Sequence, residues 1–477
     1  MLQCRHTCKL QVTRIKGTVM NETLLHGPIA PRLIRLAWPT LVVLAVQTLV
    51  GVAETYFVGF LGTAAITGVA LVFPLLMLMT MMSNGGIGGG VSSAIARAIG
   101  GGRKHDADAL VWHAIVIAVA FGALFTFGAL TGGPALFKAL GGEGDALANA
   151  LAYSNLVFGV AIPIWIANLL ASALRGAGNV KVPAALTAAG GVLTLAISPP
   201  LILGWGPFPR FGVAGAGYAM IFYYVIATAA FIAFMRSRAT PVRLTIVRIE
   251  WRLLKEILRV GILSALGTVL ANATVVLSTG LVGSFGVAAI AGYGMASRLD
   301  YLLIPLLFAL GTASVTMVGI NVGAGKLARA RRIAWTAALL SAAATGLIGL
   351  AAALAPELWM KLFSHDADVI AAGVIYLHRA APFYAFFGVG MALYFASQGA
   401  GNVLWPLIAG VTRMLVATAG GWYWVVIHHG SITGLYWFLA ASLCSFGIVN
   451  AIAFAAGLPW GPRGSSGMWA NGQRNRQ

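Results

Sequence analysis

Twelve apolar stretches recur along the 477-residue chain, and each is long enough to cross a lipid bilayer as a single α-helix. A membrane β-barrel would show short segments that alternate polar and apolar residues, and the sequence lacks that pattern. We therefore predict an all-α polytopic membrane protein. The expected spans are residues 32–57, 63–90, 107–132, 145–172, 180–204, 212–236, 256–282, 287–318, 330–355, 367–396, 403–427 and 431–456.

The distribution of charge sets the expected orientation of these spans. Charged residues make up only 9% of the chain, against roughly 25% in soluble domains, yet the net charge is +19. Of the 31 lysines and arginines, 25 fall on the side that holds both termini and 3 on the opposite side. This is the positive-inside pattern, so we expect both termini in the cytoplasm and the chain in the cell (inner) membrane. The basicity reflects topology, and nucleic acid is not an expected partner.

A short motif occurs twice and reveals an internal repeat. Residues 175–183 read RGAGNVKVP, and residues 398–406 read QGAGNVLWP, 223 residues further on. A shift of 223 or 224 also aligns VGFLGTAAITG (58–68) with VGSFGVAAIAG (282–292). The two halves are thus predicted to be copies of one six-helix bundle. Because six is even, both copies cross the membrane in the same sense, and an axis along the membrane normal relates them.

The repeat also predicts how the chain is divided. The basic, amphipathic stretch between the halves is expected to lie on the membrane surface, where its cations meet anionic headgroups. A calmodulin-type target helix is the alternative for this stretch. Cys4 and Cys8 flank His6 near the start of the chain, a weak metal-binding pattern that coincidence explains better. The expected parts are an N-terminal tail (1–28), an N-lobe (29–236), a connector (237–255), a C-lobe (256–457) and a C-terminal tail (458–477).

The repeated motifs resemble those of a known family. GAGN followed by proline after the fourth and tenth spans, VG-x-x-G closing the first and seventh, and GAGK-x-x-R-A-R after the eighth are similar to multidrug and toxic compound extrusion (MATE) transporters. The resemblance covers about residues 30–457. It implies twelve helices in two lobes around a cleft. It further implies alternating-access export of organic, often cationic, compounds against an inward flow of protons or sodium ions.

Such a chain is expected to need no cofactor other than its coupling ion and to catalyse no reaction. Its expected partners are small organic molecules and membrane lipids, and we expect it to act as a monomer.

Acidic residues inside spans are the first candidates for ion coupling, because a charge within the membrane is costly. Glu54 and Asp300 are the two that lie well within spans. Glu54 lies toward the outer end of the first span, with Gln47 seven residues earlier on the same helical face. A buried carboxyl without a partner tends to bind a proton, and the resemblance implies an ion-binding acid at this position. The alternative is that Glu54 simply reaches the aqueous interface.

Asp300 follows Arg298 by two residues, near mid-depth of the eighth span. Residues two apart point in different directions on a helix, so these two need not pair. A structural ion pair with another helix and a role toward ion or substrate are both open for Asp300. The 223-residue shift maps Glu54 onto Leu277 and Asp300 onto Met77, so neither acid is duplicated.

Further cavity-lining positions follow from the resemblance alone. Tyr153 and Asn168 match polar residues of the family's cavity, and Gln47 and Arg298 are also expected to line it. Thr194 and Ser198, however, stand where the family typically has an asparagine and an aspartate, and Met220 replaces a threonine. Hydroxyl groups are weaker sodium ligands than a carboxylate. We therefore expect proton coupling ahead of sodium coupling, and no bound metal.

Three other functions are weaker candidates. A flippase for a lipid-linked precursor would favour a strongly cationic cleft, whereas the cations within spans are only Arg298, Arg379 and Arg413. A membrane-embedded transferase would need clustered aspartates and a metal. ATP-driven transport is disfavoured because NGGIGGG (84–90) lacks the lysine and hydroxyl of a P-loop.

Overall fold

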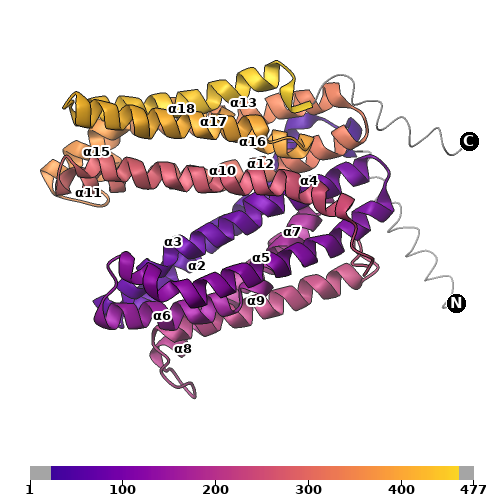
Figure 1. The fold of residues 1–477 in the computed structure, drawn as a ribbon, viewed down its shortest axis with the longest axis horizontal. Helices are drawn as coiled ribbons and strands as arrows, with labels where there is room; N and C mark the ends of the chain where they lie inside the picture. Colours follow the sequence, from indigo (N-terminus) through magenta and orange to yellow (C-terminus); the bar gives the residue numbers. More distant parts are fainter. Residues whose placement is uncertain (1–22, 461–477) are drawn as a thin grey trace, which may run out of the picture. The chain divides into compact units, whose positions relative to one another are not determined.

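The computed structural model describes residues 23–460, and all regular secondary structure in that range is helical. The chain forms two compact units, Met1–Ala265 and Leu266–Gln477. The helices of each unit lie side by side (Figure 1). Cys4, His6 and Cys8 lie outside the described residues, as do the first 22 residues of the N-terminal tail and the C-terminal tail beyond residue 460.

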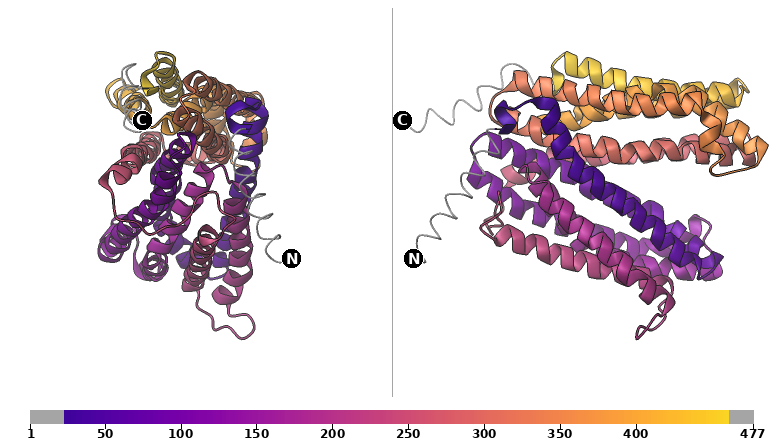
Figure 2. Two further views of the ribbon diagram at one scale, coloured as in Figure 1. Left: turned by 90° about the vertical axis from the view of Figure 1, so that its right-hand side faces the viewer. Right: turned by 180° about the vertical axis from the view of Figure 1, so that it is seen from behind.

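The first unit contains six membrane-crossing segments and the beginning of a seventh. A π-helical turn at Met82–Gly86 joins α3 to α4, and α6 and α7 meet at a bend of 51°. On the face turned away in Figure 1, α2 packs beside α8, as the right-hand view of Figure 2 shows. The helices are α2 (Ile29–Gly59), α3 (Thr63–Met81), α4 (Ile87–Gly100), α5 (Lys104–Ala139), α6 (Gly144–Gly159), α7 (Ala161–Gly176), α8 (Lys181–Leu203), α9 (Val213–Arg236) and the first part of α10 (Trp251–Gly283).

The second unit repeats this plan. Its second span is broken at Ser297, and a 3₁₀ turn at Ala381–Phe383 joins α15 to α16. Two π-helical turns carry the span that begins with α17 on to Ile427. The helices are the remainder of α10, α11 (Val287–Ala296), α12 (Arg298–Gly323), α13 (Leu327–Leu354), the short α14 (Pro356–Met360), α15 (Ala367–Ala380), α16 (Tyr384–Ala400), α17 (Leu404–Leu415) and α18 (Ile432–Ala455).

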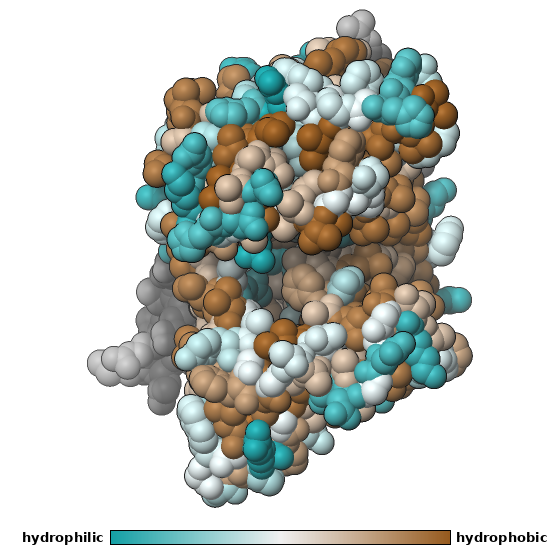
Figure 3. Space-filling model, turned by 90° about the vertical axis from the view of Figure 1, so that its left-hand side faces the viewer, coloured by the Kyte–Doolittle hydropathy of each residue, from teal (hydrophilic) through white to brown (hydrophobic). Residues whose placement is uncertain are grey.

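The predicted all-α membrane fold is confirmed. Among the described residues, 11 helical segments are long and apolar enough to cross a membrane, and the bent pair of α6 and α7 makes 12. Large apolar side chains such as Phe127 and Leu347 are mostly exposed, as expected for surfaces that contact lipid. Figure 3 views one face of the molecule, on which hydrophilic patches interrupt the hydrophobic surface.

The same helix pairs pack in both units, as a duplication requires. In the first unit α3 packs on α6, α5 on α7 and α8 on α9. In the second unit the corresponding pairs are α11 on α15, α13 on α16 and α17 on α18. The two copies therefore share a packing plan as well as a motif.

The repeated GAGN motif forms the same interhelical joint twice. Gly178 and Gly401 both adopt a positive φ, +82° and +87°, which glycine tolerates without strain. The amide of Asn179 donates to Leu174 O (2.9 Å), and the amide of Asn402 donates to Ser397 O (3.1 Å). Each joint thus reverses the chain with a glycine in the left-handed conformation and a hydrogen bond back to the helix that has just ended.

The predicted connector (237–255) belongs to the first unit and is irregular at its beginning. Residues 237–250 form no helix, and α10 begins at Trp251.

The glycine-rich residues 84–90 lie within a helical span and form no loop. Close approach explains the glycine at Gly90, where an added Cβ would lie 2.5 Å from Ile257 O. The beginning of α10 therefore packs directly on α4 in the first unit.

Candidate functional site

The candidate acid of the first unit, Glu54, lacks a hydrogen-bond partner on one oxygen. Glu54 is half-buried on α2, and its Oε1 atom is buried without a partner among residues 23–460. Its carboxyl lies within electrostatic range of the hydroxyls of Tyr153 on α6 and Tyr224 on α9. Leaving a buried carboxylate oxygen unpaired is unfavourable, whereas a carboxylic acid is tolerated at lower cost. The surroundings of Glu54 therefore suit a group that binds a proton.

Tyr153 contributes a second polar group near this acid. Its side chain is buried, and its hydroxyl donates to the Met220 sulfur on α9 at 3.4 Å. A thioether is a weak acceptor, so this contact holds the hydroxyl loosely. Tyr153 therefore lies next to Met220 and near Glu54.

The substituted positions on α8 make no described contact with the acid. Gly191 of α8 faces Val46 and Val50 of α2, so the two helices are neighbours. Thr194, however, donates to the backbone oxygen of its own helix, and the buried Ser198 hydroxyl has no hydrogen-bond partner in the described part of the chain.

The other two predicted cavity residues of this unit make no hydrogen bond to Glu54 within residues 23–460. Gln47 is exposed on α2. Asn168 on α7 donates to Ser83 Oγ at 2.8 Å in the π-helical turn, and Ser172 Oγ donates to the Asn168 carbonyl at 2.8 Å. Arg175 continues this chain of contacts by donating to Ser172 Oγ at 2.7 Å. Asn168 thus belongs to a network that fastens α7 to the second span, with no contact to Glu54 among these bonds.

In the second unit, Asp300 accepts hydrogen bonds from two tyrosines. The hydroxyl of Tyr376 on α15 donates to Oδ2 at 2.7 Å, and the hydroxyl of Tyr384 on α16 donates to Oδ1. No ion pair to Asp300 occurs within the described ranges. Asp300 therefore connects three helices of one unit through neutral donors.

Two more tyrosines complete an aromatic cluster around this acid. The Tyr376 ring meets the rings of Tyr293 (5.1 Å) and Tyr436 (5.3 Å) edge-on, and the Tyr436 hydroxyl is buried without a partner in residues 23–460. Tyr293, Tyr384 and Tyr436 were not among the predicted site residues. The 223-residue shift aligns Tyr153 with Tyr376, and this alignment is the one sequence signal toward the cluster.

The arginines within the spans of the second unit pair with aromatic rings. Arg298 lies over Phe363 (5.3 Å), Arg379 over Trp437 (5.3 Å) and Arg413 over Phe387 (4.9 Å). None of the three forms an ion pair with a carboxylate in the described part of the chain, and the Nε atoms of Arg379 and Arg413 are buried without a hydrogen-bond partner there. Arg413 lies within electrostatic range of Asp300. This unit therefore holds more positive than negative charge within its spans.

The repeat relates the two candidate acids indirectly. Tyr153 and Tyr376 occupy equivalent positions, and each lies near the acid of its own unit. The acids themselves come from non-equivalent spans, α2 for Glu54 and α12 for Asp300. Among residues 23–460, no group of three or more His, Cys, Asp or Glu side chains could hold a metal ion. Each candidate acid is thus a single carboxyl group with tyrosine hydroxyls nearby.

Comparison with known proteins shows the same architecture. A family model described as MatE matches residues 39–199 and 264–423. The chain is 27% identical to the "FAD transporter" of Shewanella oneidensis over 65% of its own length and 69% of that protein. It is 27% identical to the "Probable multidrug resistance protein NorM" of Thermotoga maritima, over 82% of this chain and 84% of that protein. The structure described as an outward-facing multidrug resistance MATE family transporter matches with a TM-score of 0.82 at 24% identity, covering 91% of this chain and 98% of that chain.

Proposed function

The chain belongs to the MatE family of multi-pass membrane transporters, which are not enzymes, and we propose that it exports small organic compounds, often cationic ones, in exchange for protons by alternating access. Multidrug efflux is the activity of the family, so compound export is the premise. The proposal concerns the coupling ion, the alternating-access cycle and the residues that serve this cycle. In this scheme the chain lies in the inner membrane with both termini in the cytoplasm.

The unpaired oxygen of Glu54 is the observation that carries proton coupling. The Glu54 carboxyl is half-buried in a membrane span, and one of its oxygens lacks a hydrogen-bond partner. Binding a proton is energetically favourable for such a group, because it removes a charge from the membrane. Protonation removes its charge and so changes which arrangement of the transporter is stable. Asp300 serves as a second protonatable group, positioned by Tyr376 and Tyr384.

Sodium coupling has less support at this site. A sodium ion needs several hard oxygen ligands, as other hard cations do. Thr194 donates its hydroxyl to its own helix, and neither Thr194 nor Ser198 makes a described hydrogen bond to Glu54. A proton requires only the one carboxyl.

The test is a pair of substitutions in purified protein reconstituted into liposomes. A pH gradient or a sodium gradient is imposed separately, and ethidium movement is followed by fluorescence. Glu54→Gln should abolish movement driven by the pH gradient, and Glu54→Asp should retain part of it. Glu357→Gln is the matched control, because the Glu357 side chain is exposed on α14 and pairs with Lys361 (2.6 Å). Unchanged pH-driven movement in Glu54→Gln protein would overturn the role of Glu54, and movement driven only by sodium would overturn proton coupling.

The arginines of the second unit favour a second class of substrate, organic anions that carry an aromatic ring. Arg298, Arg379 and Arg413 have no carboxylate partners in the described part of the chain, and a bound anion would supply one. The Shewanella oneidensis relative is named an FAD transporter, which makes FAD a suitable probe. Competition between FAD and ethidium in the same liposomes separates the two classes. Arg413→Gln should impair FAD transport more than ethidium transport if the anion binds there.

A further inference from the structure

The connector (residues 237–255) lies where the chain leaves one membrane span and enters the next. α9 ends at Arg236, α10 begins at Trp251, and both helices are long and apolar enough to cross the membrane. The residues between them therefore lie at the boundary between membrane and water. The part up to residue 250 is not helical, so hydrogen bonds outside a helix must hold it in place.

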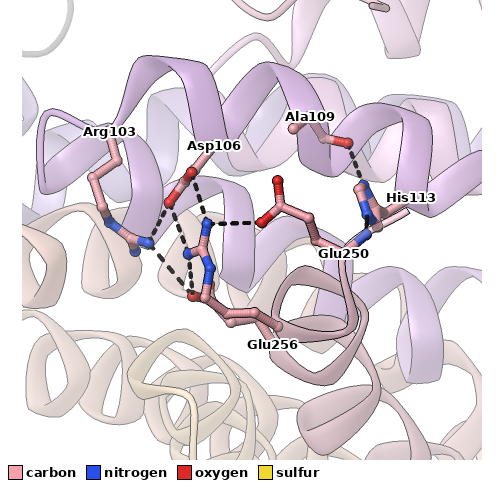
Figure 4. A network of polar contacts seen from close by, with 7 residues as sticks. Arg103, Asp106, Ala109, His113, Glu250 and Glu256 are labelled. Carbon is pink, nitrogen blue, oxygen red and sulfur yellow. Dashed lines mark hydrogen bonds and ion pairs between the residues drawn. The ribbon is translucent and has the colours of Figure 1, made fainter. Parts of the chain in front are cut away.

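The beginning of α5 provides those bonds, and Figure 4 shows the one between His113 and Glu250 together with the ion pairs around Asp106. The backbone amide of Arg243 donates to Asp108 Oδ1 at 2.7 Å, and the amide of Glu250 donates to His113 Nε2 at 2.8 Å. Nδ1 of the same imidazole lies 2.8 Å from Ala109 O, so the ring is neutral and carries its hydrogen on Nδ1. The connector is therefore attached to the first unit near both of its ends.

Ion pairs between side chains strengthen this attachment, and they occupy the carboxylates near the connector. Arg252 donates to both carboxylate oxygens of Asp106, at 3.0 and 3.1 Å. Arg103 also pairs with Asp106, at 2.8 Å, and with Glu256, at 3.4 Å. Lys104 pairs with Asp108 at 3.3 Å. The nearby carboxylates are thus occupied by Arg103, Lys104 and Arg252.

The remaining cations of the connector have no carboxylate partner. Arg238, Arg243, Arg248 and Lys255 are exposed, and none of them forms an ion pair within residues 23–460. Four positive charges therefore face outward at the membrane boundary without a counter-charge from the described part of the chain.

Exposed apolar side chains alternate with these cations. Ile246 and Trp251 are each 69% exposed, and Ile249 is 53% exposed. Val242, by contrast, is buried against the first unit. Tryptophan and aliphatic side chains next to arginines are typical of segments that rest in the headgroup region of a bilayer.

The second unit has no equivalent of this arrangement. The 223-residue shift maps Asp106 onto Arg329, Asp108 onto Arg331 and His113 onto Thr336. The acids and the imidazole that hold the connector are therefore specific to the first unit.

We propose that the connector is a binding site for anionic phospholipids. Arg243, Arg248 and Lys255 bind the phosphodiester headgroups, while Ile246 and Trp251 enter the interfacial region beside them. The hydrogen bonds to α5 hold the backbone in place, so that binding does not have to order it first. This site is independent of which compound the protein exports and of which ion drives export.

The test compares lipid binding by full-length protein in detergent. Phosphatidylglycerol and phosphatidylcholine are titrated separately, inorganic phosphate is added as a competitor of phosphatidylglycerol, and bound lipid is counted by native mass spectrometry. The variant R243Q/R248Q/K255Q should bind phosphatidylglycerol more weakly by about fivefold per removed charge, or on the order of a hundredfold in total. R243K/R248K should bind as the unchanged protein does.

The matched control removes the same charge from the second unit. K326Q/R331Q/R332Q should leave phosphatidylglycerol binding within about twofold, because those residues lie outside the proposed site. Equal losses in both triple variants would overturn the proposal in favour of general surface charge. Equal binding of phosphatidylcholine, or competition by inorganic phosphate at millimolar concentration, would overturn it as a site for anionic lipid. The retained fold of each variant is checked by its unfolding temperature in detergent.

Discussion

The hydrogen bond from Tyr376 to Asp300 should contribute measurably to stability. The Tyr376 ring is buried, and Tyr376→Phe removes only the hydroxyl that donates to the carboxyl at 2.7 Å. A hydrogen bond to a charged group contributes about 1.5–3 kcal/mol, against about 0.6 kcal/mol for an average interhelical bond in a membrane. We expect Tyr376→Phe to lower the free energy of unfolding by about 1.5–3 kcal/mol when Asp300 is ionised.

The repeat provides an internal control for this prediction. Tyr153 occupies the equivalent position, is equally buried, and donates to the weak acceptor sulfur of Met220 at 3.4 Å. Tyr153→Phe should therefore cost less than about 1 kcal/mol. Both variants are unfolded in mixed micelles of sodium dodecyl sulfate and dodecyl maltoside, with tryptophan fluorescence as the signal.

The pH dependence tests the reasoning further. The hydroxyl donates more strongly to a carboxylate than to a carboxylic acid, so the cost of Tyr376→Phe should grow as rising pH ionises Asp300. In an Asp300→Asn background the cost should fall to about 0.6 kcal/mol. Equal costs for Tyr376→Phe and Tyr153→Phe at every pH would refute the assignment of this bond as charge-assisted.

Two further substitutions test packing and the attachment of the connector. Gly176→Ala should destabilise the protein by about 1–3 kcal/mol, because the new methyl group would lie 2.4 Å from Ser92 O. Gly132→Ala, with no atom within 4 Å of its Cβ, should be neutral or stabilising by up to about 1 kcal/mol, and thermal unfolding in detergent compares the two. Asp106→Asn should cost at most about 1 kcal/mol, since its partner Arg252 is about half exposed. That cost should shrink in high salt, and a cost independent of salt would contradict an electrostatic origin.

The spans and the repeat were predictable because the bilayer restricts the possibilities. Backbone polar groups must be satisfied inside each membrane-crossing segment, so an apolar stretch such as residues 107–132 can only be a helix. The structure extends this span to Lys104–Ala139 without changing its type. The repeated GAGN motif was informative in the same way, because its second glycine adopts a positive φ and forms the same interhelical joint in both units.

The surroundings of Asp300 were not predictable in the same way. Its partners come from α15 and α16, many residues away along the chain, and hydropathy does not encode which helices meet. The repeat pointed only to Tyr376, because the 223-residue shift maps Tyr384 onto Ala161 and Tyr436 onto Val213. The directions of side chains two residues apart on a helix did predict that Arg298 need not pair with Asp300. Arg298 indeed lies over the Phe363 ring.

Irregular backbone recurs at matching depths in the second span of each unit. Shifted by 223 residues, Pro74 in α3 corresponds to the break at Ser297, and the π-helical turn that begins at Met82 corresponds to Pro305. A proline, a π-helical turn and a helix break all interrupt the regular ladder of backbone hydrogen bonds. The duplicated property is thus the position of two interruptions in the backbone hydrogen-bond ladder, and the residues that produce them differ between the units. Asp300 lies between the break at Ser297 and Pro305, so its carboxyl is carried by a short helical stretch with irregular backbone hydrogen bonding on both sides.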